Sequence, residues 1–351
     1  MSTPLSPYQK RFRAMGSPCH MSIFAERPEQ AAAGLQSAQA RVQRLEEKYS
    51  RFQAGTITSR INQAAGTGDW VPLDHETYQL FCLAQEGYRL SDGLFDITSG
   101  VLRQAWDFKR GCLPAQSALE TILPLIGMSQ LRLRPLDAQL TDPVASLGPR
   151  KSPEIPSGWA VSLPHTGMEI DFGGLVKEYA ADAAAKVLQE HGIGHGFVDL
   201  GGDLSIIGPH PEIGAWPIGV RAPRSPTRPI SRLHVCAGAV ATSGDYERFF
   251  ERNGQRYCHI LNPKTGWPVL GWASVTVVTS PCVVAGMAAT VAMLKGVREG
   301  VAWLQELGVP FFAVTAPARA VGLGGDDKAY HIVTEQSSIE HIDKVLDLVP
   351  H

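Results

Sequence analysis

The chain has 351 residues, of which 44% are hydrophobic and 19% charged, and its formal net charge is -2. This composition is ordinary for a soluble globular protein with one large core or two modest ones, so disorder is not expected. Because no basic face is concentrated along the chain, a nucleic-acid partner is not expected either.

The N-terminal residues and the apolar runs indicate a compartment. The first 17 residues contain no apolar stretch typical of a secretory signal and no lipidated-cysteine motif. No run of about 18 apolar residues, the length needed to cross a bilayer, occurs anywhere. We therefore expect a cytoplasmic protein with no membrane span.

The first part of the chain shows clear periodic patterns. In chain order, it predicts a strand at 18–25, a helix at 29–49, a helix at 75–90 and, across 91–108, a turn followed by a short helix. Residues 135–165 are rich in Pro, Ser and Gly, which disfavour both helix interiors and sheet ladders. We interpret them as an exposed excursion between core elements.

The second part alternates strands, glycine turns and helices. It predicts a strand at 168–172, a helix at 175–192, strands at 197–200 and 204–208, short strands within 235–261, a strand at 273–280, a helix at 283–295 and a strand at 311–315. The spacing is not that of regular βαβ units. The fold class is therefore predicted to be α+β, with mixed or antiparallel sheets and packed helices.

The segment from Asp171 to Lys177, Asp-Phe-Gly-Gly-Leu-Val-Lys, suits phosphate binding. Glycines let a backbone approach a ligand closely, a helix start offers free N–H groups, and a lysine adds positive charge. Taken alone, the pattern fits equally well a simple turn into a helix with a solvated lysine.

A histidine at a strand end gives a second candidate. Thr242-Ser-Gly-Asp-Tyr246 is followed by Arg256-Tyr-Cys-His259 and an Asn-Pro turn that ends at Gly266. Because the usual pKa of histidine lies near neutrality, His259 could act as a general base on a hydroxyl group. A lone histidine is more often structural.

Two further segments have simple structural interpretations. Gly93-Leu-Phe-Asp-Ile-Thr98 fits a capped turn with core aromatics beyond it, and Val198-Asp-Leu-Gly-Gly-Asp203 fits a glycine turn between two strands. Order and spacing then add information that no single block carries.

In order, these blocks resemble the ApbE family of FAD:protein FMN transferases from Met15 to about Gly296. The family's Met-Gly-Thr resembles Met15-Gly16-Ser17, and its Ser-Arg-Tyr/Phe, Ser and Ile-Asn resemble Ser50-Arg51-Phe52, Ser59 and Ile61-Asn62. Its GxFDxT, DLGGxxKG, GGD, TSGxYxR and HIxDPxTG blocks resemble residues 93–98, 171–178, 201–203, 242–248 and 259–266.

The resemblance implies one ApbE-like domain at 10–300 with two subdomains and a flavin groove, on which 301–351 packs as a C-terminal strand and tail. It implies a magnesium-dependent transferase that moves FMN from FAD to a Ser or Thr hydroxyl of an acceptor protein and releases AMP. The cofactors are then FAD and Mg²⁺.

Site residues follow by position in the matching blocks. His259 would be the general base and Lys177 would lie at the phosphates, while the carbonyl of Gly174 and the side chain of Thr290 would bind the metal. The residues expected to contact FAD are Met15, Gly16, Ser17, Phe95, Asp96, Thr98, Asp171, Gly173, Gly174, Lys177, Thr242, Ser243, Gly244, His259 and Ile260.

Three positions depart from the family pattern. Gly286 stands where the family has a metal-binding aspartate four residues before the threonine, Glu178 stands where it has glycine, and Asn262 stands for aspartate. Loss of the carboxylate is expected to weaken Mg²⁺ binding, so that Gly286→Asp would strengthen it. Another acid, such as Asp326 or Asp327, could replace it.

These departures leave two alternative functions open. The chain could bind FAD without transferring FMN, as a store or interaction module. It could also be an FAD pyrophosphatase that gives FMN and AMP, because the same metal geometry can activate water in place of an acceptor hydroxyl.

Overall fold

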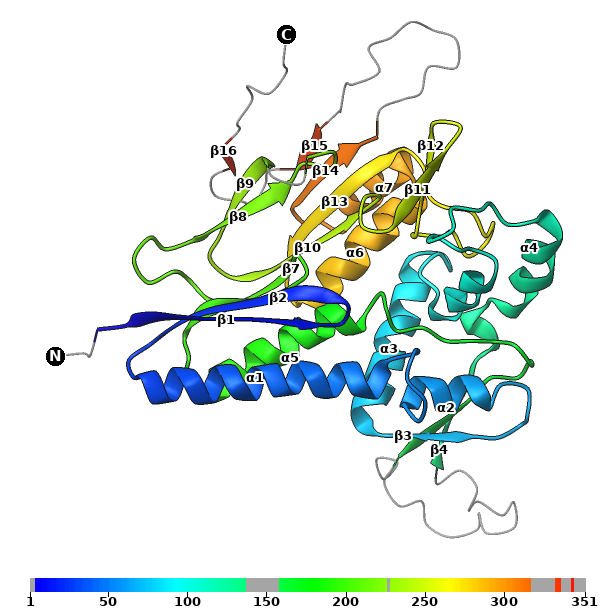
Figure 1. The fold of residues 1–351 in the computed structure, drawn as a ribbon, viewed down its shortest axis with the longest axis horizontal. Coiled ribbons are helices and arrows are strands. Elements are labelled where there is room, and N and C mark those ends of the chain that lie inside the picture. The colour runs from blue at the N-terminus through cyan, green and yellow to red at the C-terminus, as the bar shows by residue number, and fades with distance from the viewer. Residues whose placement is uncertain (1–3, 137–157, 226–227, 317–331, 336–341, 344–351) are drawn as a thin grey trace, which may run out of the picture.

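One eight-stranded sheet runs through the centre of the protein (Figure 1). The structure, a computed structural model, describes residues 4–136, 158–225, 228–316, 332–335 and 342–343. All neighbouring strands of this sheet are antiparallel. In sheet order they are β1 (Ser6–Ala14), β2 (Ser17–Ala25), β6 (His195–Leu200), β7 (Asp203–Gly208), β10 (Gly238–Gly244), β13 (Trp272–Thr279), β14 (Phe311–Thr315) and β15 (Ile332–Glu335).

Helices and smaller sheets surround this sheet. The helices are α1 (Pro28–Tyr49), α2 (Ile57–Gln63), α3 (His75–Leu90), α4 (Gln116–Ile122), α5 (Val176–Glu190), α6 (Cys282–Lys295) and α7 (Val297–Glu306), with 3₁₀ turns at Ile97–Gln104, Leu123–Leu125 and Met128–Gln130. The small sheets are β16 (Ile342–Asp343) with β9 (Pro229–Val235) and β8 (Trp216–Arg221), β3 (Val71–Leu73) with β5 (Trp159–Ser162) and β4 (Arg132–Pro135), and β11 (Phe249–Arg252) with β12 (Gln255–Cys258).

Both faces of the central sheet are buried, and the strands alternate between two cores. Ile23 and Ala25 of β2 pack into the large core that the helices share, whereas Phe24 between them points into a smaller core under β8 and β9. Side chains of a strand point to opposite faces in turn, so this period of two follows from strand geometry. The helical layer is the one that carries the candidate site.

Asp182 fixes helix α5 against helix α6. Helix α6 begins after Pro281 with no side-chain cap of its own. Asp182 on α5 instead accepts hydrogen bonds from the backbone N–H of Cys282 at 2.9 Å and of Val283 at 3.1 Å, and from the Ser205 hydroxyl at 3.0 Å. A carboxylate at a helix N-terminus also interacts favourably with the helix dipole. The relative position of α5 and α6 is therefore set beside the candidate site.

The predicted α+β class is confirmed, but the strand predicted at 168–172 is wrong. This segment is irregular. The side-chain amide of Asn62 accepts from the backbone N–H of Ile170 at 2.7 Å and donates to its carbonyl at 3.1 Å, and the N–H of Asp171 donates to the Ile97 carbonyl at 2.8 Å. These partners replace the sheet ladder that an extended apolar segment would otherwise need.

Only part of the excursion predicted at 135–165 lies within the described residues. Its central residues, 137–157, lie outside the described residues. On the C-terminal side of these residues, β5 at 159–162 belongs to a sheet, where it pairs on one edge with β3 and on the other with β4.

Within the C-terminal segment, α7 and β14 are built into the fold. Among the described helices, none combines the length and apolar character that crossing a membrane requires.

We predict that Asp182→Ala lowers the free energy of unfolding by about 1–3 kcal/mol, because it leaves two N–H groups at the start of α6 without their acceptor. Urea denaturation measures the change. Asp69→Ala, in an exposed turn, is the control and should stay within about 0.5 kcal/mol of the wild type. Equal stability of the two variants would contradict the capping role.

Candidate functional site

Lys177 and Asp203 form an ion pair that joins helix α5 to the central sheet. Asp203 is only 2% exposed, and its other carboxylate oxygen accepts from the Thr242 N–H on β10 at 3.0 Å. Burial by itself would lower the pKa of Lys177, but the carboxylates of Asp203 and Glu178 outweigh it and raise that pKa above its usual value. The ammonium group therefore stays charged.

The β1–β2 hairpin turn lies against this ion pair. Met15 and Gly16 both adopt left-handed backbone angles, with φ of 52° and 70°. A Cβ atom at Gly201 would lie 2.7 Å from Cβ of Ser17 and 4.0 Å from Cδ of Lys177. Because that contact is too close for any side chain, Gly201 has to be glycine, and the turn reaches the predicted phosphate lysine.

Asp171 orders the glycine turn before α5, and the two glycines of that turn are exposed to solvent. Asp171 accepts from Arg51 and from the Gly173 N–H, the latter at 2.9 Å. Gly173 and Gly174 are exposed, so their backbone groups face solvent. The ring of Phe95 packs beneath, 3.7 Å from where a Cβ atom of Gly174 would be. Asp171 thus orders the turn, while the two glycines are free to meet a ligand.

Asp96 and Thr98 make internal hydrogen bonds only, as far as the described contacts go. The Thr98 hydroxyl donates to Asp96 at 2.6 Å, the Met128 N–H donates to Asp96 at 2.9 Å, and the Gly127 N–H donates to Thr98 at 2.8 Å. Both side chains are buried. They hold the loop that supports Phe95, and their contact with a cofactor stays a prediction.

The end of β10 brings hydroxyl groups to helix α6. Ser243 and Thr290 share a hydrogen bond of 2.8 Å between their hydroxyls, and Thr242 and Thr276 share another of 2.8 Å. At Gly244 a Cβ atom would lie 2.6 Å from the ring of Tyr246, so this position also has to be glycine. The predicted metal ligand Thr290 therefore lies beside Ser243, which was predicted to contact FAD.

His259 follows strand β12, and this half-buried residue lies in a cationic environment. Its backbone N–H donates to the Arg248 carbonyl at 2.9 Å, and the Arg248 guanidinium lies 3.9 Å from the Cβ position of Gly16. Burial first, then the positive charges of Arg248 and Lys177, lower the pKa of His259 to about 4. The imidazole is therefore neutral near pH 7, and its buried Nδ1 has no hydrogen-bond partner among the described residues. Ile260 beside it is buried.

Two of the three departures from the family pattern touch each other. A Cβ atom at Gly286 would lie 2.6 Å from Cγ of Glu178, so the glutamate side chain fills the space beside the glycine. Burial, then the negative charge of Asp203, raises the pKa of Glu178. The third departure, Asn262, accepts from the N–H groups of Lys264 at 2.9 Å and Thr265 at 3.3 Å, so it makes the same turn that an aspartate would.

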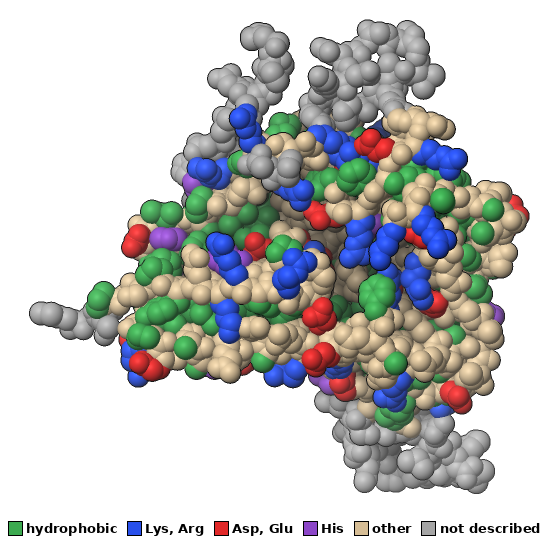
Figure 2. Space-filling view, in the orientation of Figure 1, with side chains coloured by type: hydrophobic (Ala, Val, Ile, Leu, Met, Phe, Trp, Pro, Cys, Tyr) green, Lys and Arg blue, Asp and Glu red, His purple; other side chains and the backbone are tan. Residues whose placement is uncertain are grey.

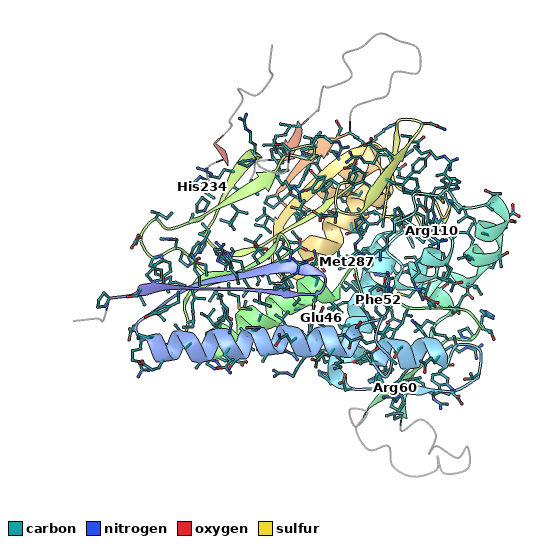
Figure 3. All side chains as sticks on the ribbon, viewed as in Figure 1. Glu46, Phe52, Arg60, Arg110, His234 and Met287 are labelled. Atoms are coloured by element: carbon teal, nitrogen blue, oxygen red, sulfur yellow. The ribbon has the colours of Figure 1, made fainter. Side chains whose placement is uncertain are left out.

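One face of the protein is hollowed. Figure 2 shows the hollow at the right-hand end of the β1–β2 hairpin, with Lys and Arg side chains gathered on its far side. In Figure 3, Met287 of α6 lies in this region, above Glu46 and the exposed Phe52. A separate cavity of about 250 Å³ lies between the central sheet and strand β8, lined among others by Thr242, Thr276 and Gly202.

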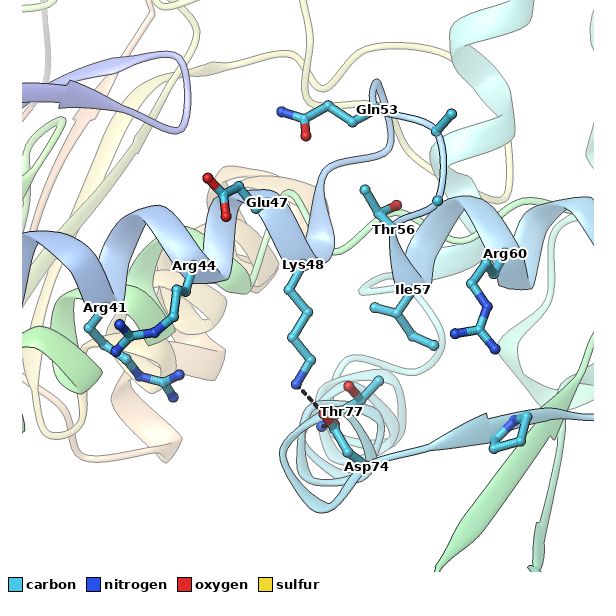
Figure 4. A pocket seen from close by; sticks show the side chains of 13 residues that line it. Arg41, Arg44, Glu47, Lys48, Gln53, Thr56, Ile57, Arg60, Asp74 and Thr77 are labelled. Atoms are coloured by element: carbon cyan, nitrogen blue, oxygen red, sulfur yellow. Dashed lines mark hydrogen bonds and ion pairs between the residues drawn. The ribbon is translucent and has the colours of Figure 1, made fainter.

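A larger pocket of about 730 Å³ lies elsewhere, between the C-terminal half of α1, α2 and the start of α3 (Figure 4). It contains none of the predicted site residues. Lys48, one of its cations, is already paired with Asp74 at 2.6 Å and with Glu76 at 2.9 Å. The larger volume therefore does not identify it as the site.

The donor atoms at the candidate site suit a hard cation. Among the described residues no group of three His, Cys, Asp or Glu side chains could hold a metal. The Gly174 carbonyl, the Thr290 and Ser243 hydroxyls and the Glu178 carboxylate offer oxygen donors, the ligand type that Mg²⁺ prefers. Glu178 Oε2 is buried without a hydrogen-bond partner among the described residues. The proposed substitutes Asp326 and Asp327 lie outside the described residues.

Comparison with known proteins agrees with this arrangement. The sequence profile of the ApbE family matches residues 15–313. The chain belongs to the ApbE family. It is 27% identical over 318 residues to the FAD:protein FMN transferase of Treponema pallidum, covering 85% of this chain and 82% of that protein. It is likewise 27% identical over 296 residues to one from Klebsiella pneumoniae, covering 83% and 84%.

Solved ApbE structures share the fold. The crystal structure of the ApbE protein from Thermotoga maritima superposes with a TM-score of 0.76 at 28% identity, covering 88% of this chain and 94% of that one. The flavin transferase ApbE of Vibrio cholerae superposes with a TM-score of 0.75 at 21% identity, covering 95% and 98%. The predicted family and architecture are thus confirmed.

Two charged residues at this candidate site, Asp203 and Glu178, are not among the site residues that the sequence predicts. The sequence pattern presents Asp203 only as part of a glycine turn, and Glu178 only as a departure from the family pattern. Because Lys177 and Asp203 are far apart in the sequence, no local sequence pattern predicts their ion pair. The available signal was the Gly-Gly-Asp turn, which combines an acidic side chain with a backbone that other elements can approach closely.

We predict that His259 makes the folded protein acid-sensitive. The unfolded chain takes up a proton at this histidine near pH 6.5, but the folded chain does so only near pH 4, so the free energy of unfolding falls as pH drops through this window. His259→Asn should lose less stability than the wild type in urea denaturation across that range. The control, His75→Asn at the exposed start of α3, should follow the wild type. Identical pH profiles for all three proteins would contradict burial of a neutral imidazole.

Proposed function

We propose that this ApbE protein is an FAD:protein FMN transferase, which moves FMN from FAD to a Ser or Thr hydroxyl of an acceptor protein with Mg²⁺ bound. The proposal is supported by the ion pair of Lys177 with Asp203, the positive charge of Lys177 acting on His259, and the hydrogen bond between Ser243 and Thr290. The names of the relatives give the reaction class.

The chemistry is one displacement at phosphorus. The acceptor hydroxyl oxygen forms a bond to the FMN-side phosphorus while the anhydride bond to the AMP phosphate breaks. The hydroxyl proton passes to His259, AMP leaves, and FMN remains in phosphoester linkage. A bound Mg²⁺ ion would neutralise pyrophosphate charge and align the phosphorus with the attacking oxygen.

The charges of the site match this reaction. Lys177 and Arg248 both disfavour a protonated His259 in the free protein. Two anionic phosphates bound between them would offset these cations and make His259 a better proton acceptor. Neutral imidazole is thus available before FAD binds, and proton transfer becomes more favourable once it is bound.

An assay with FAD and Mg²⁺, with and without an acceptor protein, tests the proposal. We expect AMP only when acceptor is present, together with flavin fluorescence that survives denaturing electrophoresis. AMP without acceptor would support an FAD pyrophosphatase, and bound FAD with no AMP would support a flavin-binding protein. Either of these results would contradict transfer.

We predict that His259→Ala lowers the transfer rate constant by about 10²–10⁴-fold, the usual range for loss of a general base, with little change in FAD affinity. For the wild type, kcat/KM for FAD should fall as pH approaches about 4, where His259 of the free protein becomes protonated, and the transfer rate constant at saturating FAD should begin to fall at a higher pH, because the bound phosphates raise the pKa of His259. Stopped-time assays and FAD fluorescence titrations measure the two quantities. His75→Ala should behave as the wild type, and an unchanged rate in His259→Ala would exclude the base role.

A further inference from the structure

Helices α5 and α6 differ from the family pattern at two positions that contact each other. Position 286 on α6 has no side chain, and the glutamate of position 178 on α5 extends into that volume. A Cβ atom at Gly286 would lie 2.6 Å from Cγ, 3.1 Å from Cδ and 3.2 Å from Oε1 of Glu178. The glutamate side chain therefore occupies the space into which a side chain at position 286 would extend.

The Glu178 carboxylate is buried and incompletely paired. Glu178 is 8% exposed, and its Oε2 atom has no hydrogen-bond partner among the described residues. Its nearest cation, Lys177 Nζ, is 3.8 Å from Oε1 and already forms the ion pair with Asp203. A buried carboxylate oxygen without a partner is costly, which points to a ligand that the protein chain does not itself supply.

Further oxygen donors come from the elements next to Glu178. Thr290 lies one helical turn beyond Gly286 on α6, so it projects from the same face of the helix, and its hydroxyl is paired with Ser243 at 2.8 Å. The exposed carbonyl of Gly174 precedes Glu178 just before α5 begins. Carboxylate, hydroxyl and carbonyl oxygens together form a donor set for a hard divalent cation.

We propose that Glu178, reaching across from α5, supplies the anionic metal ligand that Gly286 lacks, so that the charge of the metal shell is kept while its source moves to the other helix. This inference rests on the proposed function, since the cation would bridge the protein and the FAD pyrophosphate. It also reverses the expectation for Gly286→Asp: added alone, the aspartate meets Glu178 at 2.6 Å and crowds the site rather than completing it.

The test measures Mn²⁺ binding by electron paramagnetic resonance, with and without FAD, and FAD binding by fluorescence in EDTA and in Mg²⁺. Glu178→Gln keeps the side-chain shape and removes the charge. We expect it to weaken Mn²⁺ binding about tenfold or more, and to bind FAD no more weakly than the wild type in EDTA, because a carboxylate near phosphates repels them when no cation lies between. Glu190→Gln, exposed at the far end of α5, is the matched control and should change neither value.

The reciprocal exchange provides the second arm. Gly286→Asp alone should lower the melting temperature without strengthening Mn²⁺ binding, and Glu178→Gly with Gly286→Asp should restore Mn²⁺ binding to near the wild-type value. Equal Mn²⁺ binding by the wild type and Glu178→Gln, including no binding by either, overturns the assignment of Glu178. Failure of the wild type to bind FAD in either buffer overturns the proposed function instead, and is read from a separate titration.

Discussion

The buried ion pair between Lys177 and Asp203 is the interaction on which the candidate site depends. Asp203 is almost completely enclosed, and a carboxylate in such surroundings persists only with a charged partner and hydrogen bonds to its oxygens. Lys177 provides the charge and the Thr242 N–H provides the hydrogen bond. The start of α5, the turn before β7 and strand β10 are therefore tied to one point, and the rest of the site is arranged around it.

Around this point the protein combines rigid support with exposed backbone. Asp182 fixes α5 to the beginning of α6, and Arg51 with Asp171 holds the glycine turn from beneath. The glycines of that turn remain open to solvent. This division is suited to an anionic ligand, because a preorganised set of donors and charges loses little on binding.

The departures from the family pattern make physical sense as a pair. A glutamate in place of glycine at 178 adds a charge beside the predicted phosphate site, and a glycine in place of aspartate at 286 removes one. Because the two positions are in contact, one change accommodates the other. Asn262 keeps its turn through the same hydrogen bonds that an aspartate would accept, so it alters charge without altering the backbone.

The sequence by itself determined the class of fold, most helices and strands, and the family, since hydrophobic periodicity is local and the ordered blocks survive in the printed residues. It failed at 168–172, where an apolar extended segment takes its hydrogen bonds from Asn62 and Ile97 rather than from a neighbouring strand. From the sequence alone, Gly286, which removes a charge, and Glu178, which adds one, are two separate departures from the family pattern. Contacts between residues far apart in the chain decide such questions, and these depend on how α5 packs on α6. Only the tertiary structure decided that the two substitutions share one volume, because that is set by the distance between two helices, which no local pattern encodes.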